Sequence, residues 1–203
     1  RDALLKPLNL VAGVVERRQT LPILANVLIG VEGNQLTLTG TDLEVELLGK
    51  VSLDGVTVDG DITVPARKLL DIVKSLPDDS VISVEVEDQR AIIKSGRSRF
   101  TLSTLPASEF PNVEQGSATL EFDVLQGKLK GLIDKTAFAM AQQDVRYYLN
   151  GMLWEIKDSV FRVVATDGHR LALSTLAGIT TSEEKQVILP RKGVLELSRL
   201  LID

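Results

Sequence analysis

The most polar cluster in the second half of the chain is Thr166-Asp167-Gly168-His169-Arg170, which contains the only histidine. An Asp-x-His spacing can seat a metal ion or form an acid–base pair. The sequence supplies no second histidine, no cysteine and no close group of carboxylates to complete such a site. A serine–histidine–acid triad is not excluded by counting residues, but the G-x-S-x-G elbow that would support it is missing. A turn that shapes a surface pocket is therefore the favoured interpretation. The first half carries Thr41-Asp42-Leu43-Glu44 at the same place.

A second polar segment, residues 142–151, contains both tyrosines of the chain next to amides and an arginine. Such a loop can stack its aromatic rings on exposed bases and hydrogen-bond to phosphate groups. Tyrosines that cover a domain core with their hydroxyls outward are an equally good interpretation. Arg17-Arg18-Gln19-Thr20 occupies the corresponding place in the first half, so both loops are polar and basic.

These segments belong to a pattern that the chain contains twice, at an offset of about 125 residues. Four positions of the first half align with identical residues of the second without a gap: Leu24, Leu28, Thr41 and Asp42 with Leu149, Leu153, Thr166 and Asp167. Residues 64–70 align in the same way with residues 189–195. A period this long exceeds that of a solenoid repeat and predicts two copies of a whole domain.

Hydrophobic periodicity predicts the elements that position the polar segments. Helices are expected over residues 3–15, 66–76, 125–141 and 191–201, with Pro7 in the first turn of its helix. Strands are expected over residues 43–51, 56–64, 82–86, 91–94, 100–105, 120–124, 152–156, 161–165, 170–175 and 187–189, with hairpin turns at 33–34 and 157–159. Each copy is therefore predicted to be an α+β domain, an antiparallel sheet with two helices packed on one side. Residues 106–117 are the expected linker.

Composition narrows the classes of function. A hydrophobic content of 44% with 25% charged residues is typical of a globular chain. The absence of cysteine excludes disulfides, thiolate nucleophiles and cysteine-ligated zinc. No apolar run has the length of a membrane span and no secretion signal opens the sequence, so a cytoplasmic protein is expected.

The distribution of charge indicates a polyanionic partner although the net charge is −5. The first predicted helix has a net charge of +1 and each of the other three has +2. The predicted strands and turns are correspondingly acidic. Basic helices and acidic sheets would meet phosphates on one side only, with weak, salt-dependent contacts. For any single helix, a solubilising surface explains the bias equally well.

Several motifs in order along the whole chain closely resemble the bacterial DNA polymerase sliding clamp family. They include Thr20-Leu21-Pro22-Ile23-Leu24, Gly40-Thr41-Asp42-Leu43-Glu44, Ser95-Gly96-Arg97-Ser98-Arg99-Phe100, Gln143-Asp144-Val145-Arg146-Tyr147-Tyr148-Leu149-Asn150-Gly151, Ala165-Thr166-Asp167-Gly168-His169-Arg170-Leu171 and Pro190-Arg191-Lys192-Gly193.

The resemblance implies a non-catalytic processivity factor of tandem DNA-clamp domains, without cofactor or metal. Two subunits of three domains each would close head to tail into a ring around duplex DNA, with helices lining the hole. Polymerase, clamp loader and repair proteins would bind through a short linear motif. The residues carried over for DNA binding are Arg18, Gln143, Tyr147 and Tyr148; for the peptide cleft, Leu149, Thr166, Gly168, His169, Arg170 and Leu171; for the subunit interface, Lys68, Arg97, Arg99 and Leu102.

Against that family pattern, residues 1–110 would be a first clamp domain with its opening strand clipped, and residues 117–203 a second one without its closing strands. The third domain would be absent, so the ring and the complete peptide cleft are expected only of a longer protein. Two alternatives stay open. One is a module that docks peptides independently of DNA, and the other, less favoured, is a metal-dependent phosphoryl-transfer enzyme using Asp42, Asp167 and His169.

Overall fold

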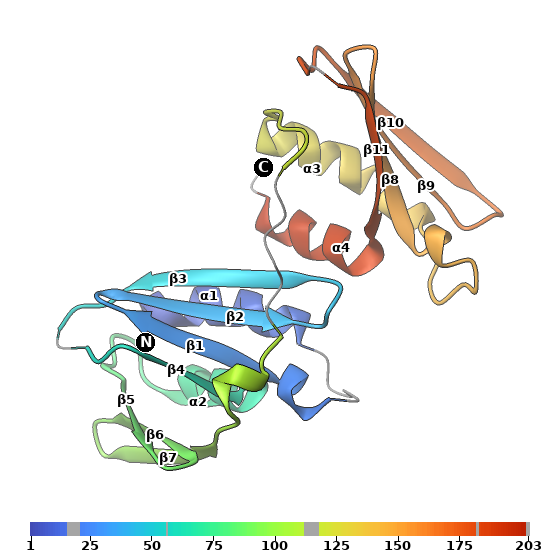
Figure 1. Cartoon of the computed structure of the whole chain (residues 1–203). Helices are drawn as coiled ribbons and strands as arrows, with labels where there is room; N and C mark the ends of the chain where they lie inside the picture. The colour runs from blue at the N-terminus through green and yellow to red at the C-terminus, as the bar shows by residue number, and fades with distance from the viewer. Residues whose placement is uncertain (16–20, 56, 112–117, 182, 202–203) are drawn as a thin grey trace. The chain divides into compact units, whose positions relative to one another are not determined.

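The computed structural model of the chain describes residues 1–15, 21–55, 57–111, 118–181 and 183–201 (Figure 1). The chain divides into two compact units, Arg1–Glu114 (unit 1) and Gln115–Asp203 (unit 2).

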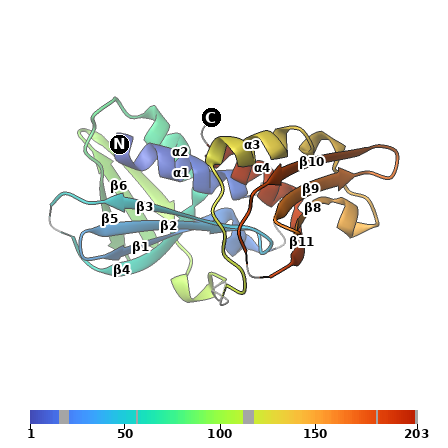
Figure 2. The same ribbon diagram turned by 90° about the horizontal axis from the view of Figure 1, so that it is seen from above.

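Unit 1 is built on a four-stranded antiparallel sheet with the strand order β3-β2-β1-β4. Its strands are β1 (Asn26–Glu32), β2 (Gln35–Thr41), β3 (Glu46–Ser52) and β4 (Gly60–Pro65). The helices α1 (Asp2–Val14) and α2 (Ala66–Ser75) lie on one face of this sheet in both views (Figures 1 and 2). A three-stranded sheet of β5 (Ser83–Glu87), β6 (Arg90–Ser95) and β7 (Ser98–Ser103) completes the unit, with short 3₁₀ helices η1 (Pro22–Ala25) and η2 (Ala107–Glu109).

Unit 2 repeats the four-stranded sheet with the order β10-β9-β8-β11. Its strands are β8 (Gly151–Lys157), β9 (Val160–Thr166), β10 (Leu171–Ala177) and β11 (Lys185–Pro190); its helices are α3 (Gln126–Asp134), η3 (Ala137–Ala139), η4 (Tyr147–Leu149) and α4 (Arg191–Leu200). Each strand and α4 begins about 125 residues after its counterpart, as the internal repeat predicts. The register is also shared, because Leu28 faces Thr39 just as Leu153 faces Val164.

Each unit has its own hydrophobic core between helices and sheet. In unit 1, Leu8 and Val11 of α1 pack with Leu69 and Val73 of α2. In unit 2, Phe161 lies at the centre, with the rings of Trp154 and Phe122 edge-on at 5.2 and 5.4 Å. The α+β class and the antiparallel sheets with two helices on one side are therefore confirmed.

Helix α1 begins at Asp2, so Pro7 lies in its interior and not in its first turn as predicted. Proline cannot donate the backbone hydrogen bond of that position. The ring lies against β3, where a Cβ on Gly49 would come within 2.8 Å of the Pro7 Cβ. A glycine is thus needed at position 49 for the helix to reach the sheet.

The helix predicted over residues 125–141 is shorter in the structure, since α3 ends at Asp134. The buried Thr136 hydroxyl donates to the Leu132 carbonyl at 2.8 Å, and the Thr136 amide donates to the Ile133 carbonyl at 3.0 Å. The second bond closes a tighter turn than an α-helix allows, so the chain leaves the helix and enters η3.

Two strand predictions were wrong, one in its existence and one in its extent. Residues 120–124 alternate as a strand would and Leu120, Phe122 and Val124 pack on the core, but no described strand lies beside them to share hydrogen bonds. Strand β4 begins at Gly60 and not at residue 56. Part of the expected linker also belongs to unit 1, because Phe110 is buried there. Among the described residues, no helix is both long and apolar enough to cross a bilayer.

Candidate functional site

The Thr166–Arg170 turn connects β9 to β10 and is held by its own side chains. The Asp167 carboxylate accepts the backbone N–H groups of His169 and Arg170 at 2.9 and 3.0 Å. The Thr166 hydroxyl accepts the Gly168 N–H at 3.1 Å and donates to the Arg170 carbonyl at 2.7 Å. These backbone hydrogen bonds, with the adjacent Arg170 guanidinium, hold the pKa of Asp167 below its ordinary value. Asp167 therefore serves as the acceptor that shapes the turn.

Unit 1 contains the same turn with a different tip. The Asp42 carboxylate accepts the N–H groups of Glu44 and Val45 at 3.0 and 2.8 Å, and the Thr41 hydroxyl accepts the Leu43 N–H at 3.0 Å. These three hydrogen bonds match their counterparts in unit 2 position by position. The turn is thus part of the duplicated architecture, and only its outer side chains differ between the copies.

The segment between η3 and β8 is a loop whose base is closed by hydrogen bonds among three polar residues, Asp144, Arg146 and Asn150. Asn150 accepts the Asp144 N–H and donates to the Asp144 carbonyl, both at 2.9 Å. The Arg146 guanidinium donates two hydrogen bonds to the Asp144 carboxylate, from Nε at 3.0 Å and from a terminal nitrogen at 2.8 Å. This pairing lowers the pKa of Asp144 to about 2 and raises that of Arg146. The loop therefore has a fixed base and carries its remaining side chains outward.

Loop and turn meet at Gly168. A Cβ built on this residue would lie 3.1 Å from a terminal nitrogen of Arg146, and its φ of 87° is in the left-handed region. Only glycine meets both conditions without strain. Arg146 thus joins the loop to the turn, a role that the sequence analysis did not assign to it. Its place two residues after Asp144 in the polar segment 142–151 was the available signal, but the ion pair between the two side chains needed coordinates.

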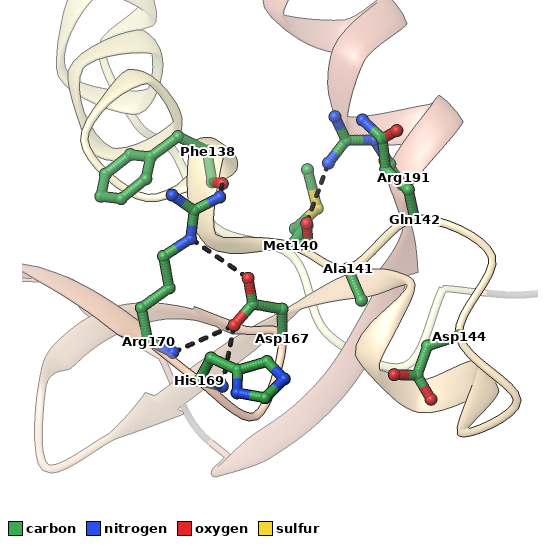
Figure 3. A pocket seen from close by; sticks show the side chains of 9 residues that line it. All are labelled: Phe138, Met140, Ala141, Gln142, Asp144, Asp167, His169, Arg170 and Arg191. Carbon is green, nitrogen blue, oxygen red and sulfur yellow. Dashed lines mark hydrogen bonds and ion pairs between the residues drawn. The ribbon is translucent and has the colours of Figure 1, made fainter.

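A depression of about 310 Å³ lies between the loop, the turn and the start of α4 (Figure 3). Arg170 forms one wall: its guanidinium donates to Asp167 at 3.1 Å and to the Phe138 carbonyl at 2.8 Å, and lies 5.4 Å from the Phe138 ring centroid. Arg191 forms another and donates to the Met140 carbonyl at 3.2 Å. The lining is completed by Ala141, Gln142, Asp144 and His169.

Leucines border the turn on the strand side. Leu171 opens β10, pairs in register with Thr166 and is 64% exposed. Leu149 ends η4 and is buried. The structure therefore brings Thr166, Gly168, His169, Arg170 and Leu171 together in one turn and strand start, and places Leu149 at the end of the neighbouring loop.

The predicted DNA contacts fall on the outer part of the loop. Tyr147 is 83% exposed, and its ring lies edge-on to that of Tyr148 with centroids 5.9 Å apart. Gln143 has a left-handed φ of 56° and is exposed. Arg18 lies outside the described residues. Because the tyrosine rings face solvent, their interpretation as a cover for the core of unit 2 is not supported.

The residues carried over for a subunit interface lie on α2 and on the three-stranded sheet of unit 1. Lys68, Arg97 and Arg99 are exposed, with Arg97 in the hairpin turn between β6 and β7. Leu102 differs from them because its side chain is buried in the core of unit 1.

The geometry gives little support to the metal-dependent alternative. Within the described ranges, no three His, Asp or Glu side chains are grouped so as to hold a metal ion. The Asp167 carboxylate is occupied by two backbone N–H groups and by Arg170. Asp42 belongs to unit 1 and makes the equivalent turn contacts there.

Comparisons with known proteins show the family to which the chain belongs. The model of the DNA polymerase III beta subunit N-terminal domain matches residues 1–114, and that of the central domain matches residues 123–203. The chain belongs to the beta sliding clamp family. The clamp of Pseudomonas aeruginosa is 65% identical over the whole chain, and that of Escherichia coli is 50% identical over 99% of it.

Solved clamps share the fold as well as the sequence. A Pseudomonas aeruginosa sliding clamp superposes over the whole chain with a TM-score of 0.94 at 64% identity, and a Caulobacter crescentus clamp over 98% with 0.89 at 42%. A further Pseudomonas aeruginosa clamp was solved bound to griselimycin. The chain spans about half the length of these clamps, 56% of the first curated relative and 55% of the first structure. The expected family and its tandem clamp fold are thereby confirmed.

Proposed function

We propose that this chain forms part of a processivity clamp that encircles duplex DNA and tethers the replicative polymerase to it. Residues 1–110, within unit 1, would be its first clamp domain, and residues 117–203, within unit 2, its second. The ring would be completed by further domains of a longer subunit and by a second subunit. Such a protein is an accessory factor of the cytoplasm and not an enzyme.

The observation that carries this proposal is the ordered match of two clamp domain models along a chain whose two units have the same topology. Charge supports it too. Helix α2 carries Arg67, Lys68 and Lys74 against Asp71, and α4 also carries three basic residues and one acidic residue. The excess is small, which suits a ring that keeps DNA by enclosure and needs only weak phosphate contacts.

Peptide docking belongs to the same proposal. The turn of residues 166–170 with Leu171 and Leu149 would hold the short linear motif of polymerase, clamp loader and repair proteins. Exposed Leu171 would supply apolar contact, while His169 and Arg170 would supply polar contacts at its rim. The residues that would touch DNA are Arg18, Gln143, Tyr147 and Tyr148. Those that would meet the second subunit are Lys68, Arg97, Arg99 and Leu102.

Whether the protein encloses DNA is tested by comparing how well it is retained on circular and on linear DNA. The full-length protein is loaded onto nicked circular DNA, and half of the sample is then cut once by a restriction enzyme. Enclosure predicts that the protein stays on the circles and is lost from the linear molecules at moderate salt. Equal retention on both forms would refute it. If peptide binding persists when retention is equal, the DNA-independent docking module becomes the better account.

A further inference from the structure

The loop of residues 141–150 meets one residue of α4, Arg191, at both of its ends. The Arg191 side chain donates to the carbonyl of Met140, the residue before the loop, at 3.2 Å (Figure 3). The Arg191 backbone N–H donates to the carbonyl of Asn150, the last residue of the loop, at 2.9 Å. A residue that is 51 positions away from Met140 in the sequence thus holds the start and the end of the loop together.

Hydrogen bonds inside the loop join its two ends to its tip. The Ala141 N–H donates to the Leu149 carbonyl at 3.0 Å, and the Leu149 N–H donates to the Arg146 carbonyl at 2.9 Å. The Asn150 N–H donates to the Tyr147 carbonyl at 3.0 Å. Compact loops of this size, with ends close together and packed by their own side chains, are frequently functional. A shift of the ends therefore moves the whole loop with the side chains that it carries.

The start of the loop lies where water has little access. Met140 is 3% exposed and Ala141 is 6% exposed, while Arg191 is half-buried beside them. A buried carbonyl that loses its donor is costly, because water does not replace the lost hydrogen bond. The Arg191 guanidinium therefore stabilises the one backbone conformation in which the Met140 carbonyl points toward α4.

The stability of α4 does not explain an arginine at this place. Arg191 is the first residue of the helix, and the first turn contains no acidic residue and no side-chain cap. The positive end of the helix dipole disfavours a cation there. Helix α2 of unit 1 begins with Ala66 at the matching position. The contact of Arg191 with the loop supplies the compensation that the helix itself lacks.

Unit 1 holds the matching carbonyl with a different residue. Arg67 donates to the Val15 carbonyl at 3.1 Å. At the repeat offset Val15 corresponds to Met140, whereas Arg67 corresponds to Lys192 and not to Arg191. Both units therefore satisfy the same carbonyl with an arginine, although the two arginines come from neighbouring helix positions. The shared element is the hydrogen bond at the start of the loop.

We infer that Arg191 is a positioning residue for DNA contact, which fixes the loop of residues 141–150 so that Tyr147 and Tyr148 meet the duplex. This role rests on the proposed function, in which the two tyrosines touch DNA. The competing role for Arg191 is a direct contact with phosphate. A phosphate contact adds to the salt dependence of DNA binding, whereas positioning acts through the hydrogen bond to Met140 and leaves the salt dependence unchanged.

Hydrogen exchange of the full-length protein without DNA tests the anchor. Arg191→Met keeps a long side chain but has no donor, so exchange in peptides spanning residues 141–150 should accelerate about tenfold or more, with β9 unchanged. Lys192→Met is the matched control, because it removes the same charge from the next position of α4 and should leave the loop at the parent rate. Unchanged loop exchange in Arg191→Met, or equal acceleration in Lys192→Met, would overturn the inference.

DNA binding separates positioning from phosphate contact. Anisotropy with a labelled primed junction at several salt concentrations should show that Arg191→Met binds about fivefold more weakly with an unchanged salt slope. Combined with Tyr147→Ala, the Arg191→Met change should cost less than about twofold, because the ring that it positions is missing. A salt slope lower by about 1, together with normal loop exchange, would make Arg191 a phosphate ligand instead.

Arg191→Lys decides the question if Arg191→Met does not fold. Lysine keeps the charge but lacks the planar guanidinium, so loop exchange should rise about threefold and DNA affinity should fall at an unchanged salt slope. Loop exchange at the parent rate in this variant would contradict the role of Arg191. The exchange measurement uses no DNA, so it tests the anchor even if the protein does not enclose DNA. Conversely, a negative result leaves retention on closed circles unaffected.

Discussion

Leu43 and Gly168 occupy the same position in the two copies of one turn, and both have a left-handed backbone, with φ of 79° and 87°. Glycine adopts this conformation without cost, whereas a leucine is strained by about 1 kcal/mol or more. Leu43 is also largely exposed, so burial offers little compensation. Unit 1 therefore stores strain at a turn that shares three hydrogen bonds with the turn of unit 2.

Relief of this strain should be measurable. Leu43→Gly should raise the free energy of unfolding of unit 1 by up to about 1 kcal/mol, because the left-handed penalty exceeds the extra chain entropy of glycine. Hydrogen exchange of the β2 and β3 amides reports it separately from unit 2. Gly168→Ala is the converse change and should destabilise unit 2, since it adds both strain and a contact with Arg146. Faster exchange in Leu43→Gly would contradict the account.

The Asp144–Arg146 pair should make the loop acid-sensitive. The folded pKa of Asp144 is lowered from an ordinary 3.8 to about 2, so its stabilising effect is complete above pH 4 and is lost as the pH falls toward 2. A carboxyl carbon titration by NMR should find that midpoint. In Arg146→Gln the midpoint should return toward 3.8, whereas Lys130→Gln, which removes a cation on α3, should leave it unchanged. An Asp144 midpoint near 4 in the parent protein would contradict the pairing.

Phe110 should matter for the stability of unit 1. Because it is buried between η1 and the sheet, Phe110→Ala should lower the free energy of unfolding of this unit by about 3 kcal/mol. Denaturation followed by hydrogen exchange should show the loss in β1 and β4 and not in β8. Phe138→Ala removes an exposed ring and is the control, with an expected loss below about 1 kcal/mol. Equal losses in the two variants would argue against the buried role.

Partner binding should depend on Leu171 and His169 without a change in folding. Both side chains are exposed, so Leu171→Ala and His169→Ala should leave the thermal midpoint within about 2 °C of the parent. Affinity for polymerase, measured on the full-length protein by surface plasmon resonance, should fall about tenfold or more for Leu171→Ala. Val58→Ala removes an exposed valine in unit 1 and should have no effect.

Tyr147 should contribute to DNA contact by stacking. Tyr147→Ala in the full-length protein should weaken binding to a primed junction by about tenfold, whereas Tyr147→Phe keeps the ring and should stay near the parent value. Anisotropy with labelled DNA at several salt concentrations measures both. Retention on closed circles should be unchanged in Tyr147→Ala, because enclosure does not depend on that ring. Equal losses for Ala and Phe would assign the effect to the hydroxyl group instead.

The internal repeat explains how much of the fold was predictable. Matching residues such as Leu28 and Leu153 pointed to one register, and the structure has it in both sheets. The hydrophobic periodicity did not predict the places where a hydrogen bond ends a helix early or where a strand has no neighbour. The Thr136 hydroxyl ends α3 although the apolar spacing continues to Met140, and residues 120–124 alternate without a neighbouring strand.

The candidate site was predictable where it is contiguous in sequence. The turn of residues 166–170 was recognised as a pocket-shaping element because its residue types favour turns. The roles of Arg146, Phe138 and Arg191 were not recognised, because each acts through a contact with a distant part of the chain: Gly168, the Arg170 guanidinium and the Met140 carbonyl. Such contacts have no periodic signature.

The Thr63 hydroxyl shows that two copies of one fold can require different side chains at the same position. It is fully buried, donates to the Leu105 carbonyl at 2.8 Å and accepts the Leu105 N–H at 3.2 Å, so it fastens the segment after β7 to β4. Unit 2 has Ile188 at the matching position, and this side chain can form neither hydrogen bond. Thr63→Ile in unit 1 would therefore leave the Leu105 amide and carbonyl without that partner, so a residue that one copy carries would destabilise the other.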